Sequence, residues 1–223
     1  MASIEDEPIR LEAPGPYTRS QLPMLRETPL PPTLQLRSSF ITALAQRRSA
    51  EVFTPISADE LATWLHYTTS VQAINAEDPS RQRRYVASFG ALHPAHILLG
   101  SPNGSWNAYV PGRHALGELP IDLVSAAALR AKAQQHFQTE DATLVALLSD
   151  SDLGAHYYLN PLSLMLRDGG VLLGHAALVA AALGLGFRIL GSTGTPFLEH
   201  LVRDLPFKPV ATGLAWVGGG RAV

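Results

Sequence analysis

The segment HYYLNPLSLMLRDGGVLLGHAALVAAALGLGFRILGSTG, residues 156–194, decides the fold of this chain. Its centre, 171–187, is an apolar run that His175 and three glycines interrupt. This run falls short of the roughly 20 residues that a membrane-spanning helix needs. We therefore expect a buried helix over 168–186, whose small residues allow close packing, including across a dimer axis. A strand over 187–191 should follow it.

The segments around this one alternate between short apolar stretches and helical ones. Short apolar stretches bounded by turn residues are typical of strands, and here they are 95–100, 106–110, 142–150 and 207–220. The alanine-rich segment 119–138 predicts a helix. Thr195 and Pro196 suit the N-cap and first position of another helix over 195–205. Since helices and strands are mixed without a regular strand–helix–strand repeat, we predict an α+β fold.

The N-terminal part has a different character. Residues 1–36 contain seven prolines and few periodic apolar positions, so we expect an extended Pro-rich arm that can wrap a partner subunit. Apolar residues at helical spacing predict a helix over 38–48. The capping box of Ser57 and Glu60 predicts the start of the next helix. The polar segment 74–84 is expected to be a surface loop.

The composition limits the classes of function. The chain of 223 residues is 46% hydrophobic and only 16% charged, which favours an additional apolar surface, most simply a subunit interface. A net charge of −2 gives no sign of nucleic acid or an anionic membrane as partner. The absence of cysteine excludes disulfides, thiol nucleophiles and cysteine-based metal sites. The acidic N-terminus lacks an apolar signal-peptide core, so we expect a cytoplasmic protein.

Arg47, Arg48 and Ser49 are the first candidate binding residues. Guanidinium groups offer forked donors that match phosphate oxygens, and the serine hydroxyl adds a compact donor. The alternative is a solvated helix end, where arginines also interact favourably with the C-terminal dipole. The segment by itself leaves both interpretations open.

The turn Ser88-x-Gly90-Ala91 is the second candidate. Because glycine has no side chain, backbone amides at such a turn can approach a ligand closely. A turn that merely joins two elements is the alternative. His93 and His96 would have metal-ligand spacing only on a helix, and the proline between them argues against one, so we expect no metal site.

Five motifs follow one another along the chain: RRSAE (47–51), SFGALHP (88–94), HY (156–157), DGGV (168–171) and ALGLG (182–186). In this order and spacing they resemble the flavin-dependent nitroreductase superfamily. Within it they look most like the azoline dehydrogenases of the microcin and streptolysin type. The resemblance implies a mainly antiparallel mixed sheet flanked by helices, with 37–223 as a single FMN domain. It also implies an interlocked homodimer with two FMN sites at the interface.

The resemblance assigns ten positions to FMN binding: Arg47, Arg48, Ser49, Ser88, Gly90, Ala91, Leu92, Gly191, Ser192 and Arg221. The first three match residues that hold the phosphate and the ring edge of FMN. The next four match a loop that lines the isoalloxazine ring from the neighbouring subunit. The following pair matches the backbone that donates an N–H to flavin N5, and the last arginine would add a cationic phosphate contact.

The resemblance also implies Tyr157 as a catalytic residue, beside a lysine whose position holds His156 in this chain. A phenol with the ordinary pKa near 10 is a poor base unless a neighbour lowers that pKa. An imidazole titrates near neutrality and can be the base itself or polarise the phenol. An aromatic loop that packs on the core is the alternative. Further departures from the family pattern are Glu51 for a cation, Val171 for a histidine, and Gly174-His175 for Gln-Asn.

The function that the resemblance implies is an FMN-dependent oxidoreductase. Its most probable reaction in this family is the oxidation of azoline rings in a modified peptide to azoles, with dioxygen as electron acceptor. An NAD(P)H-dependent reductase of nitro compounds or quinones is an alternative on the same fold. A flavin-poor pseudoenzyme that scaffolds a peptide-modifying complex is another, motivated by Glu51 and His156. The expected partners are a second copy and a peptide-modifying protein, such as a cyclodehydratase or a carrier.

Overall fold

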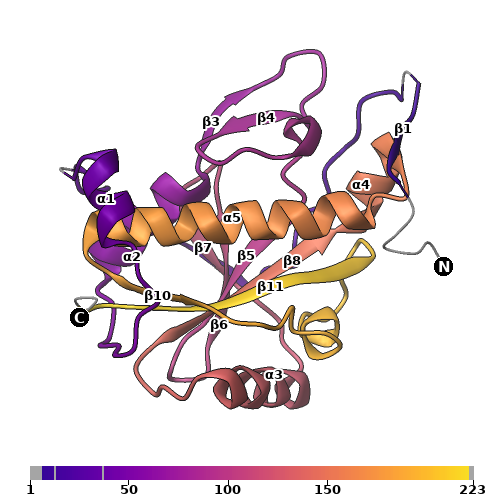
Figure 1. Ribbon diagram of the computed structural model, residues 1–223. Helices are drawn as coiled ribbons and strands as arrows, with labels where there is room; N and C mark the ends of the chain where they lie inside the picture. The colour runs from indigo at the N-terminus through magenta and orange to yellow at the C-terminus, as the bar shows by residue number, and fades with distance from the viewer. Residues whose placement is uncertain (1–6, 13, 37, 221–223) are drawn as a thin grey trace.

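The computed structural model describes residues 7–12, 14–36 and 38–220. A seven-stranded sheet forms its centre, with strand order β10-β11-β8-β5-β6-β7-β2 (Figure 1). The strands are β2 (Arg26–Pro29), β5 (Ala95–Gly100), β6 (Trp106–Val110), β7 (Ala115–Glu118), β8 (Thr143–Asp150), β10 (Gly186–Ile189) and β11 (Pro209–Gly218). Every neighbouring pair in this sheet is antiparallel. The expected α+β class with a mainly antiparallel sheet is confirmed.

The central strand β8 is buried on both faces along its whole length. Its side chains alternate between two hydrophobic clusters: Leu144 and Leu148 belong to one, and Val145 and Leu147 to the other. Successive residues of a strand point to opposite faces of a sheet. A strand that is buried on both faces therefore needs a covering layer on each side.

These layers are α3 (Leu123–His136) on one face and α5 (Leu162–Leu183) with α2 (Ala58–Thr69) on the other (Figure 1). By length and composition alone, α5 would pass as a membrane-spanning helix. In the fold it is a core helix that packs against α2 and β11, and the Trp64 indole N–H donates to Ala176 O at 3.0 Å. The expected buried helix is thus present, with different limits.

The limits of α5 have local causes. It begins at Leu162, six residues earlier than predicted, because the apolar residues before Asp168 continue the helix. It ends at Gly184, whose φ of 72° is left-handed. Glycine reaches that conformation without a steric cost, so it is a common helix terminator.

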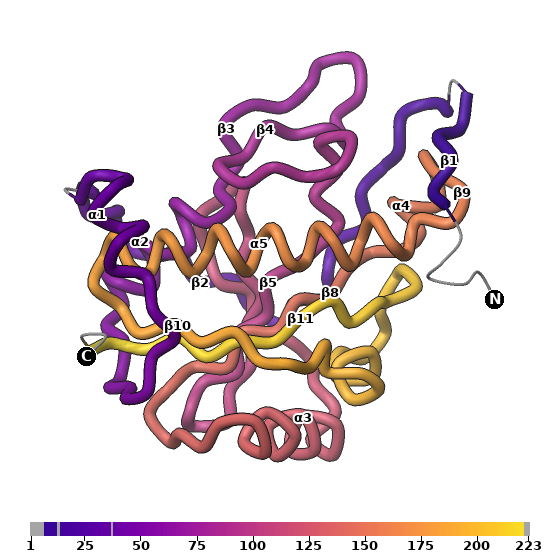
Figure 2. Tube along the Cα trace, in the orientation of Figure 1, coloured from indigo at the N-terminus to yellow at the C-terminus, as the bar shows by residue number. Residues whose placement is uncertain are grey.

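The N-terminal segment runs along the body of the molecule (Figure 2). Its strand β1 (Ile9–Arg10) pairs with β9 (Tyr158–Leu159), and β2 forms the edge of the main sheet beside β7. The division of the chain at residue 36 stays a prediction, although residues 26–29 contribute a strand to the sheet.

The first two helices begin with a serine cap, and the cap of the second was predicted. Ser39 caps α1 (Phe40–Gln46), and Ser57 caps α2. The capping box is confirmed: Glu60 N–H donates to Ser57 Oγ at 3.3 Å, and Ser57 N–H donates to Glu60 Oε2 at 3.0 Å. Both orphan donors at the start of α2 are thereby satisfied.

Two predicted elements are wrong. The ends of segment 74–84 belong to a hairpin of β3 (Val71–Ile74) and β4 (Gln82–Arg84), so only its middle is a loop. The helix expected over 195–205 is one 3₁₀ turn, η2 (Phe197–His200). The Glu199 carboxylate accepts the Ala211 N–H at 3.2 Å, which ties this turn to β11 instead of letting a longer helix form.

Candidate functional site

Two groups of predicted binding residues follow α1 and β4, and these elements lie near different parts of α5 (Figure 1 and Figure 2). Arg48 lies beside Gly184, where the helix ends. Ser88 contacts Asp168, which lies in the second turn of α5. Asp168 and Gly184 are 16 residues apart (184 − 168), which is about 24 Å along the helix. One chain by itself therefore does not bring the two groups together.

The first group follows α1. Arg47 is the C-cap of this helix, and its N–H donates to Ala43 O at 2.9 Å. Beyond Arg48 and Ser49, the Ala50 N–H donates to Phe187 O at 3.0 Å and so fixes the segment to β10. The side chains of residues 47–49 stay exposed.

Arg48 lines a cavity of about 400 Å³ between α1, the end of α5 and the start of β10. Much of the wall consists of small residues, which are Ala45, Ala177, Ala181 and Gly184. A Cβ atom added to Gly184 would meet nothing within 4 Å. This hollow therefore combines a cation with room for a ligand group.

Gly191 and Ser192 lie farther along, beyond the end of β10. The Ser192 hydroxyl accepts the Gly194 N–H at 3.2 Å, and the Gly191 backbone faces the His136 ring at the end of α3. Four extended residues separate Gly191 from Phe187, which is roughly 13 Å. Gly191 and Ser192 thus follow the strand that lines the cavity, but they are not part of the cavity wall.

The second group is the loop that begins at Ser88, and Asp168 of α5 holds it. Ser88 Oγ donates to Asp168 Oδ2 at 2.7 Å, and the Phe89 N–H donates to Asp168 Oδ1 at 3.1 Å. Ser88 Oγ also accepts the His93 N–H at 2.8 Å. Burial raises the pKa of Asp168, although the hydrogen bonds from Ser88 and Phe89 oppose that shift.

The loop has an unusual backbone. Gly90, Ala91 and His93 have φ angles of 57°, 58° and 46°. Left-handed conformations are rare for residues other than glycine, so the contacts of Ser88 with Asp168 must hold the loop in this shape. Ser88, Gly90 and Ala91 line a surface hollow of about 530 Å³. Leu92 is fully buried, so its side chain does not face this hollow.

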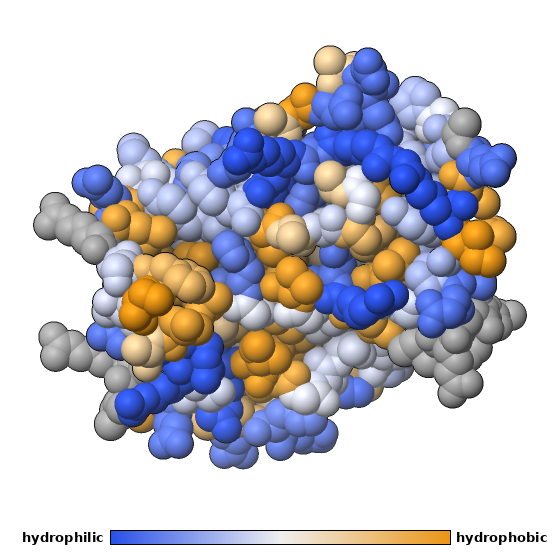
Figure 3. Space-filling model, turned by 45° about the horizontal axis from the view of Figure 1, so that its top comes forward, coloured by the Kyte–Doolittle hydropathy of each residue, from blue (hydrophilic) through white to orange (hydrophobic). Residues whose placement is uncertain are grey.

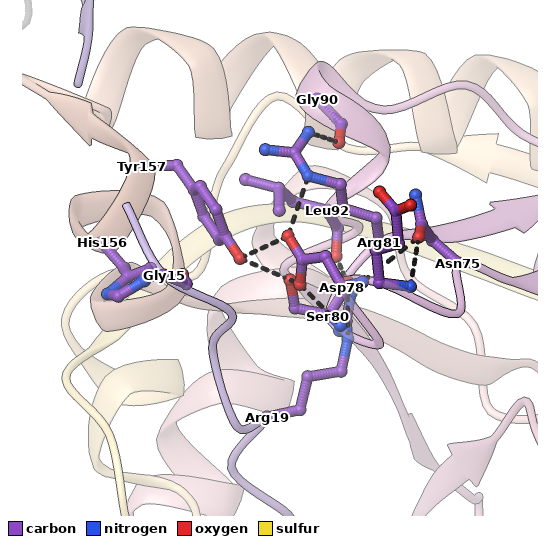
Figure 4. A network of polar contacts seen from close by, with 11 residues as sticks. Gly15, Arg19, Asn75, Asp78, Ser80, Arg81, Gly90, Leu92, His156 and Tyr157 are labelled. Atoms are coloured by element: carbon purple, nitrogen blue, oxygen red, sulfur yellow. Dashed lines mark hydrogen bonds and ion pairs between the residues drawn. The ribbon is translucent and has the colours of Figure 1, made fainter. Parts of the chain in front are cut away.

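Tyr157 ends α4 (Ser151–Tyr157) and is 1% exposed. Its hydroxyl donates to Asp78 Oδ2 at 2.7 Å and lies 2.8 Å from Ser80 Oγ (Figure 4). Arg81 Nε donates to the same Asp78 oxygen at 2.9 Å, and Arg81 Nη1 donates to Gly90 O at 2.8 Å. This network joins the end of α4, the β3–β4 loop and the loop at Ser88.

The network fixes the protonation states of its members. Burial raises the pKa of Tyr157, so its phenol stays protonated near neutral pH. Burial would also raise the pKa of Asp78, but hydrogen bonds from Ser80, Tyr157 and Arg81 outweigh it and lower that pKa to about 2. Asp78 is therefore a stable carboxylate acceptor for the phenol.

His156 is partly exposed beside this network. Its Nε2 lies 2.7 Å from Gly15 O, and its ring meets the Tyr157 ring edge-on at 4.8 Å (Figure 4). A carbonyl only accepts, so Nε2 carries the hydrogen and Nδ1 is left as an acceptor. His156 thus offers a proton acceptor next to Tyr157.

The sequence interpretation did not identify Asp78, Arg81 or Asp168 as part of this region. Asp168 stands in the motif DGGV, and an acidic residue at the start of that motif was the available signal. Glu51 is exposed, and Arg221 lies outside the described residues. Among the residues that the structure describes, no group of three or more histidine, aspartate or glutamate side chains is placed to hold a metal ion.

No protein-family model matches the sequence, and no curated protein matches it. Solved structures do match the fold. A nitroreductase-type protein from Ralstonia eutropha JMP134 aligns with a TM-score of 0.69 at 17% identity, over 97% of this chain and 99% of the other. A chain of the E. coli microcin synthetase McbBCD complex, solved with truncated pro-MccB17 bound, aligns at 0.56 and 18% identity, over 78% and 68%.

A third structure, a nitroreductase-type protein from Desulfovibrio desulfuricans in complex with FMN, aligns with a TM-score of 0.53 at 16% identity, over 82% of this chain and 87% of the other. By its fold the chain is therefore a nitroreductase-like α+β protein. The expected resemblance is confirmed at the level of the fold, and it includes a chain of the microcin synthetase complex.

Proposed function

We propose that this protein is an FMN-dependent oxidoreductase whose binding site forms between two copies of the chain. The observation that carries the proposal is the position of the Arg48 cavity and the Ser88 loop near opposite ends of α5. A two-fold axis near the middle of this helix would place the cavity of one chain beside the loop of its partner. The fold shared with an FMN-bound protein supports the same proposal.

The residues around the cavity fit the phosphate end of FMN. Arg47 and Arg48 supply cationic donors, Ser49 supplies a hydroxyl, and the small wall residues leave space. Glu51 is exposed, so its carboxylate can point into solvent and away from the phosphate. Bound FMN would supply the hydride-accepting chemistry, and the protein would supply orientation and proton transfer.

The substrate that we propose is an azoline ring in a modified peptide, oxidised to an azole with dioxygen as the final electron acceptor. This oxidation requires loss of a proton from the ring carbon beside the carbonyl. We assign that proton to His156 Nδ1, because its Nε2 already donates to Gly15 O. Tyr157 is protonated and held by Asp78, so we assign it the role of orienting His156 and the substrate.

The partners that we propose are a second copy of the chain and a protein that makes or delivers the azoline peptide, such as a cyclodehydratase or a carrier. The match to a chain of the microcin synthetase complex supports a partner of this kind. The mainly polar surface is interrupted by apolar areas on the face that Figure 3 brings forward. A subunit interface needs such areas.

The visible absorption spectrum of the purified protein with added FMN tests the proposal. We expect a yellow protein that keeps FMN through gel filtration. The double variant Arg47→Ala/Arg48→Ala should bind FMN at least tenfold more weakly, while Arg203→Ala, an exposed arginine near α3, should bind it normally. A wild-type protein that stays colourless with FMN present would refute the proposal.

A flavin-poor scaffold in a peptide-modifying complex is the second candidate. Two observations favour it: Glu51 stands next to the proposed phosphate clamp, and the Tyr157 hydroxyl is already engaged by Asp78. If the protein is a scaffold, its complex should form azoles equally well with the wild type and with the double variant Arg47→Ala/Arg48→Ala. Bleaching of a bound flavin by NAD(P)H without any peptide would instead indicate a nitro or quinone reductase.

A further inference from the structure

A cavity of about 210 Å³ lies between residues 19–24, the β3–β4 hairpin, and strands β5 and β6, and it shares Arg84 and His93 with the hollow at the Ser88 loop. Its cationic side chains are Arg19, Arg84 and Arg113, and none of its wall residues, all within the described part of the chain, is Asp or Glu. We propose that this cavity binds a small organic acid, with the carboxylate at Arg84 and an apolar body against the neighbouring aliphatic side chains.

Arg84 provides the main evidence. It is the last residue of β4, it is partly buried, and its hydrogen bonds go to neutral groups. Nε and Nη2 donate to Gln82 Oε1 at 3.1 and 2.7 Å, and Nη1 donates to Thr69 Oγ1 at 3.2 Å. A guanidinium has five N–H donors, so these three bonds leave two of them for a ligand. A buried charge without a counter-ion is costly.

Asp168 attracts the Arg84 guanidinium without a direct ion pair. Asp168 and Arg84 line a small void of about 10 Å³ and form no ion pair within 4.0 Å. The oxygens of Asp168 accept from Ser88 and from the Phe89 backbone instead. The positive charge of Arg84 is therefore available to an anion that enters from the cavity.

Arg19 adds a second partly buried charge of the same sign. Its guanidinium donates only to backbone carbonyls, which are those of Ser80, Leu92 and His93 (Figure 4). Burial lowers the pKa of Arg84 to about 9, and the charge of Arg19 adds to this effect. A bound carboxylate would relieve both costs, because an opposite charge favours the protonated guanidinium.

The other polar groups of the cavity add no competing charge. Burial lowers the pKa of His93 and of His96 to about 3, so both imidazoles are neutral at pH 7. His93 Nε2 donates to the Gln82 carbonyl at 3.0 Å. Arg113 at the rim is half exposed and already paired with Glu27 at 2.7 Å. Arg19 and Arg84 form no ion pair within 4.0 Å among the described residues, and Asp78, Asp150 and Asp168 attract them only without direct contact.

The remaining wall selects for an apolar body of limited size. Its aliphatic side chains are Leu22, Met24, Val71, Ile97 and Val110. A volume of about 210 Å³ corresponds to on the order of seven water molecules. A flavin nucleotide does not fit in this space, whereas an aromatic or short aliphatic acid does. This cavity is therefore distinct from the hollow beside Arg48.

Calorimetric titration of the full chain with benzoate tests the proposal, with benzamide as the uncharged analogue of the same shape. We expect benzoate to bind and to raise the melting temperature, and benzamide to bind at least tenfold more weakly. Equal binding of the two would refute the role of the charge. Inorganic phosphate that binds as tightly as benzoate would refute the organic acid.

Arg84→Met and Arg83→Met form a matched pair on β4. Arg83 is exposed and precedes Arg84 on the strand, so its side chain points to the opposite face. We expect Arg84→Met to weaken benzoate binding at least tenfold and Arg83→Met to leave it unchanged. Equal effects of the two would refute the assignment of the carboxylate to Arg84.

A second variant, which keeps Arg19 and Arg84, tests the proposal even if Arg84→Met does not fold. Val110→Phe narrows the cavity from its rim on β6 and leaves the guanidinium groups in place. Benzoate binding should fall at least tenfold in this variant. Unchanged binding would show that the ligand lies outside the cavity and would overturn the proposal.

Discussion

The Tyr157 hydroxyl joins two segments far apart in the sequence, because it meets Asp78 and Ser80 of the β3–β4 loop, where Arg81 also lies over its ring. Hydrogen bonds to charged groups contribute about 1.5–3 kcal/mol, and the loss of this one leaves Asp78 with fewer donors. We expect Tyr157→Phe to lower the free energy of unfolding by about that amount, measured by urea denaturation. Bound FMN should be retained, and most turnover should be lost.

Tyr158→Phe is the control for this variant. Tyr158 is the next residue; its ring packs edge-on against Phe89, and its hydroxyl lies beside Gly90. Removal of its hydroxyl should change stability by no more than about 0.5 kcal/mol. Equal losses from the two variants would contradict a specific role of the Tyr157–Asp78 hydrogen bond.

Asp78 predicts a pH dependence. Its pKa is lowered from the ordinary 3.8 to about 2, so its stabilising contacts are fully present above about pH 4 and disappear as the pH falls toward 2. The stability difference between the wild type and Asp78→Asn should therefore be largest at pH 5 and shrink at pH 2. Urea midpoints of both proteins across this range measure it, and a constant difference would contradict the lowered pKa.

At the scale of residues, the sequence predicts side chains that stand in a motif and misses those that support them. Ser88 and Gly90 are recognisable because glycine and serine mark the turn. Asp168 is 80 residues from Ser88, and Asp78 is 79 residues from Tyr157. No local pattern indicates which distant carboxylate a hydroxyl will reach, since that depends on the packing of α5 and the hairpin.

At the scale of elements, Gly169 sets how closely α5 approaches the sheet. A Cβ atom there would lie 2.7 Å from Thr212 O of β11, closer than atoms can approach. Gly169→Ala should force the helix away from the strand and destabilise the protein by about 1–3 kcal/mol. Gly170→Ala adds the same methyl where nothing lies within 4 Å, and it should gain up to about 1 kcal/mol of helix propensity.

Chemical denaturation of these two variants at low protein concentration measures both effects. A loss of stability in Gly170→Ala as large as in Gly169→Ala would contradict the close approach to Thr212. The two glycines are neighbours on one helix, so the change to alanine raises helix propensity equally at both positions. Only the contact with Thr212 differs between the two variants.

The strongly apolar elements were the most predictable ones. Strands β5 and β6 have the predicted limits, because turn residues bound each of them. The hairpin β3–β4 was not predicted. Its strands are mostly exposed and carry polar residues, so their sequence lacks the alternation of apolar and polar residues that marks a half-buried strand. The helix predicted over 195–205 failed for a different reason: Thr195 does not cap it, because its hydroxyl lies 3.2 Å from the Thr193 hydroxyl, and Glu199 ties the single turn to β11.

At the scale of the whole molecule, the separation of the two groups of candidate residues is the feature that the sequence does not reveal. Each motif has a local signal, but its distance from the others depends on where α5 carries the chain. The motif order is compatible with one site per chain and with a site shared between chains. Only the three-dimensional position of Arg48 and Ser88, beside parts of α5 that are about 24 Å apart, favours the shared site.

The shared site requires a dimer, and α1 offers the surface for it. Phe40, Ile41 and Leu44 are 66%, 70% and 51% exposed on this helix, which directly precedes the proposed phosphate clamp. Exposed apolar side chains grouped on one helix are typical of an interface. Ile41→Glu would place a charge in that interface, where burial without a partner is costly. We expect the wild type to be dimeric and Ile41→Glu to be monomeric in sedimentation, with FMN affinity reduced at least tenfold.

Val124→Glu is the matched control. Val124 is 78% exposed, but it lies on α3, on the opposite face of the sheet from α5, and a glutamate suits the first turn of that helix. This variant should stay dimeric and keep FMN. A wild-type chain that is monomeric and yet binds FMN tightly would contradict the shared site. A monomeric Ile41→Glu with unchanged FMN affinity would place the whole site within one chain and separate dimer formation from cofactor binding.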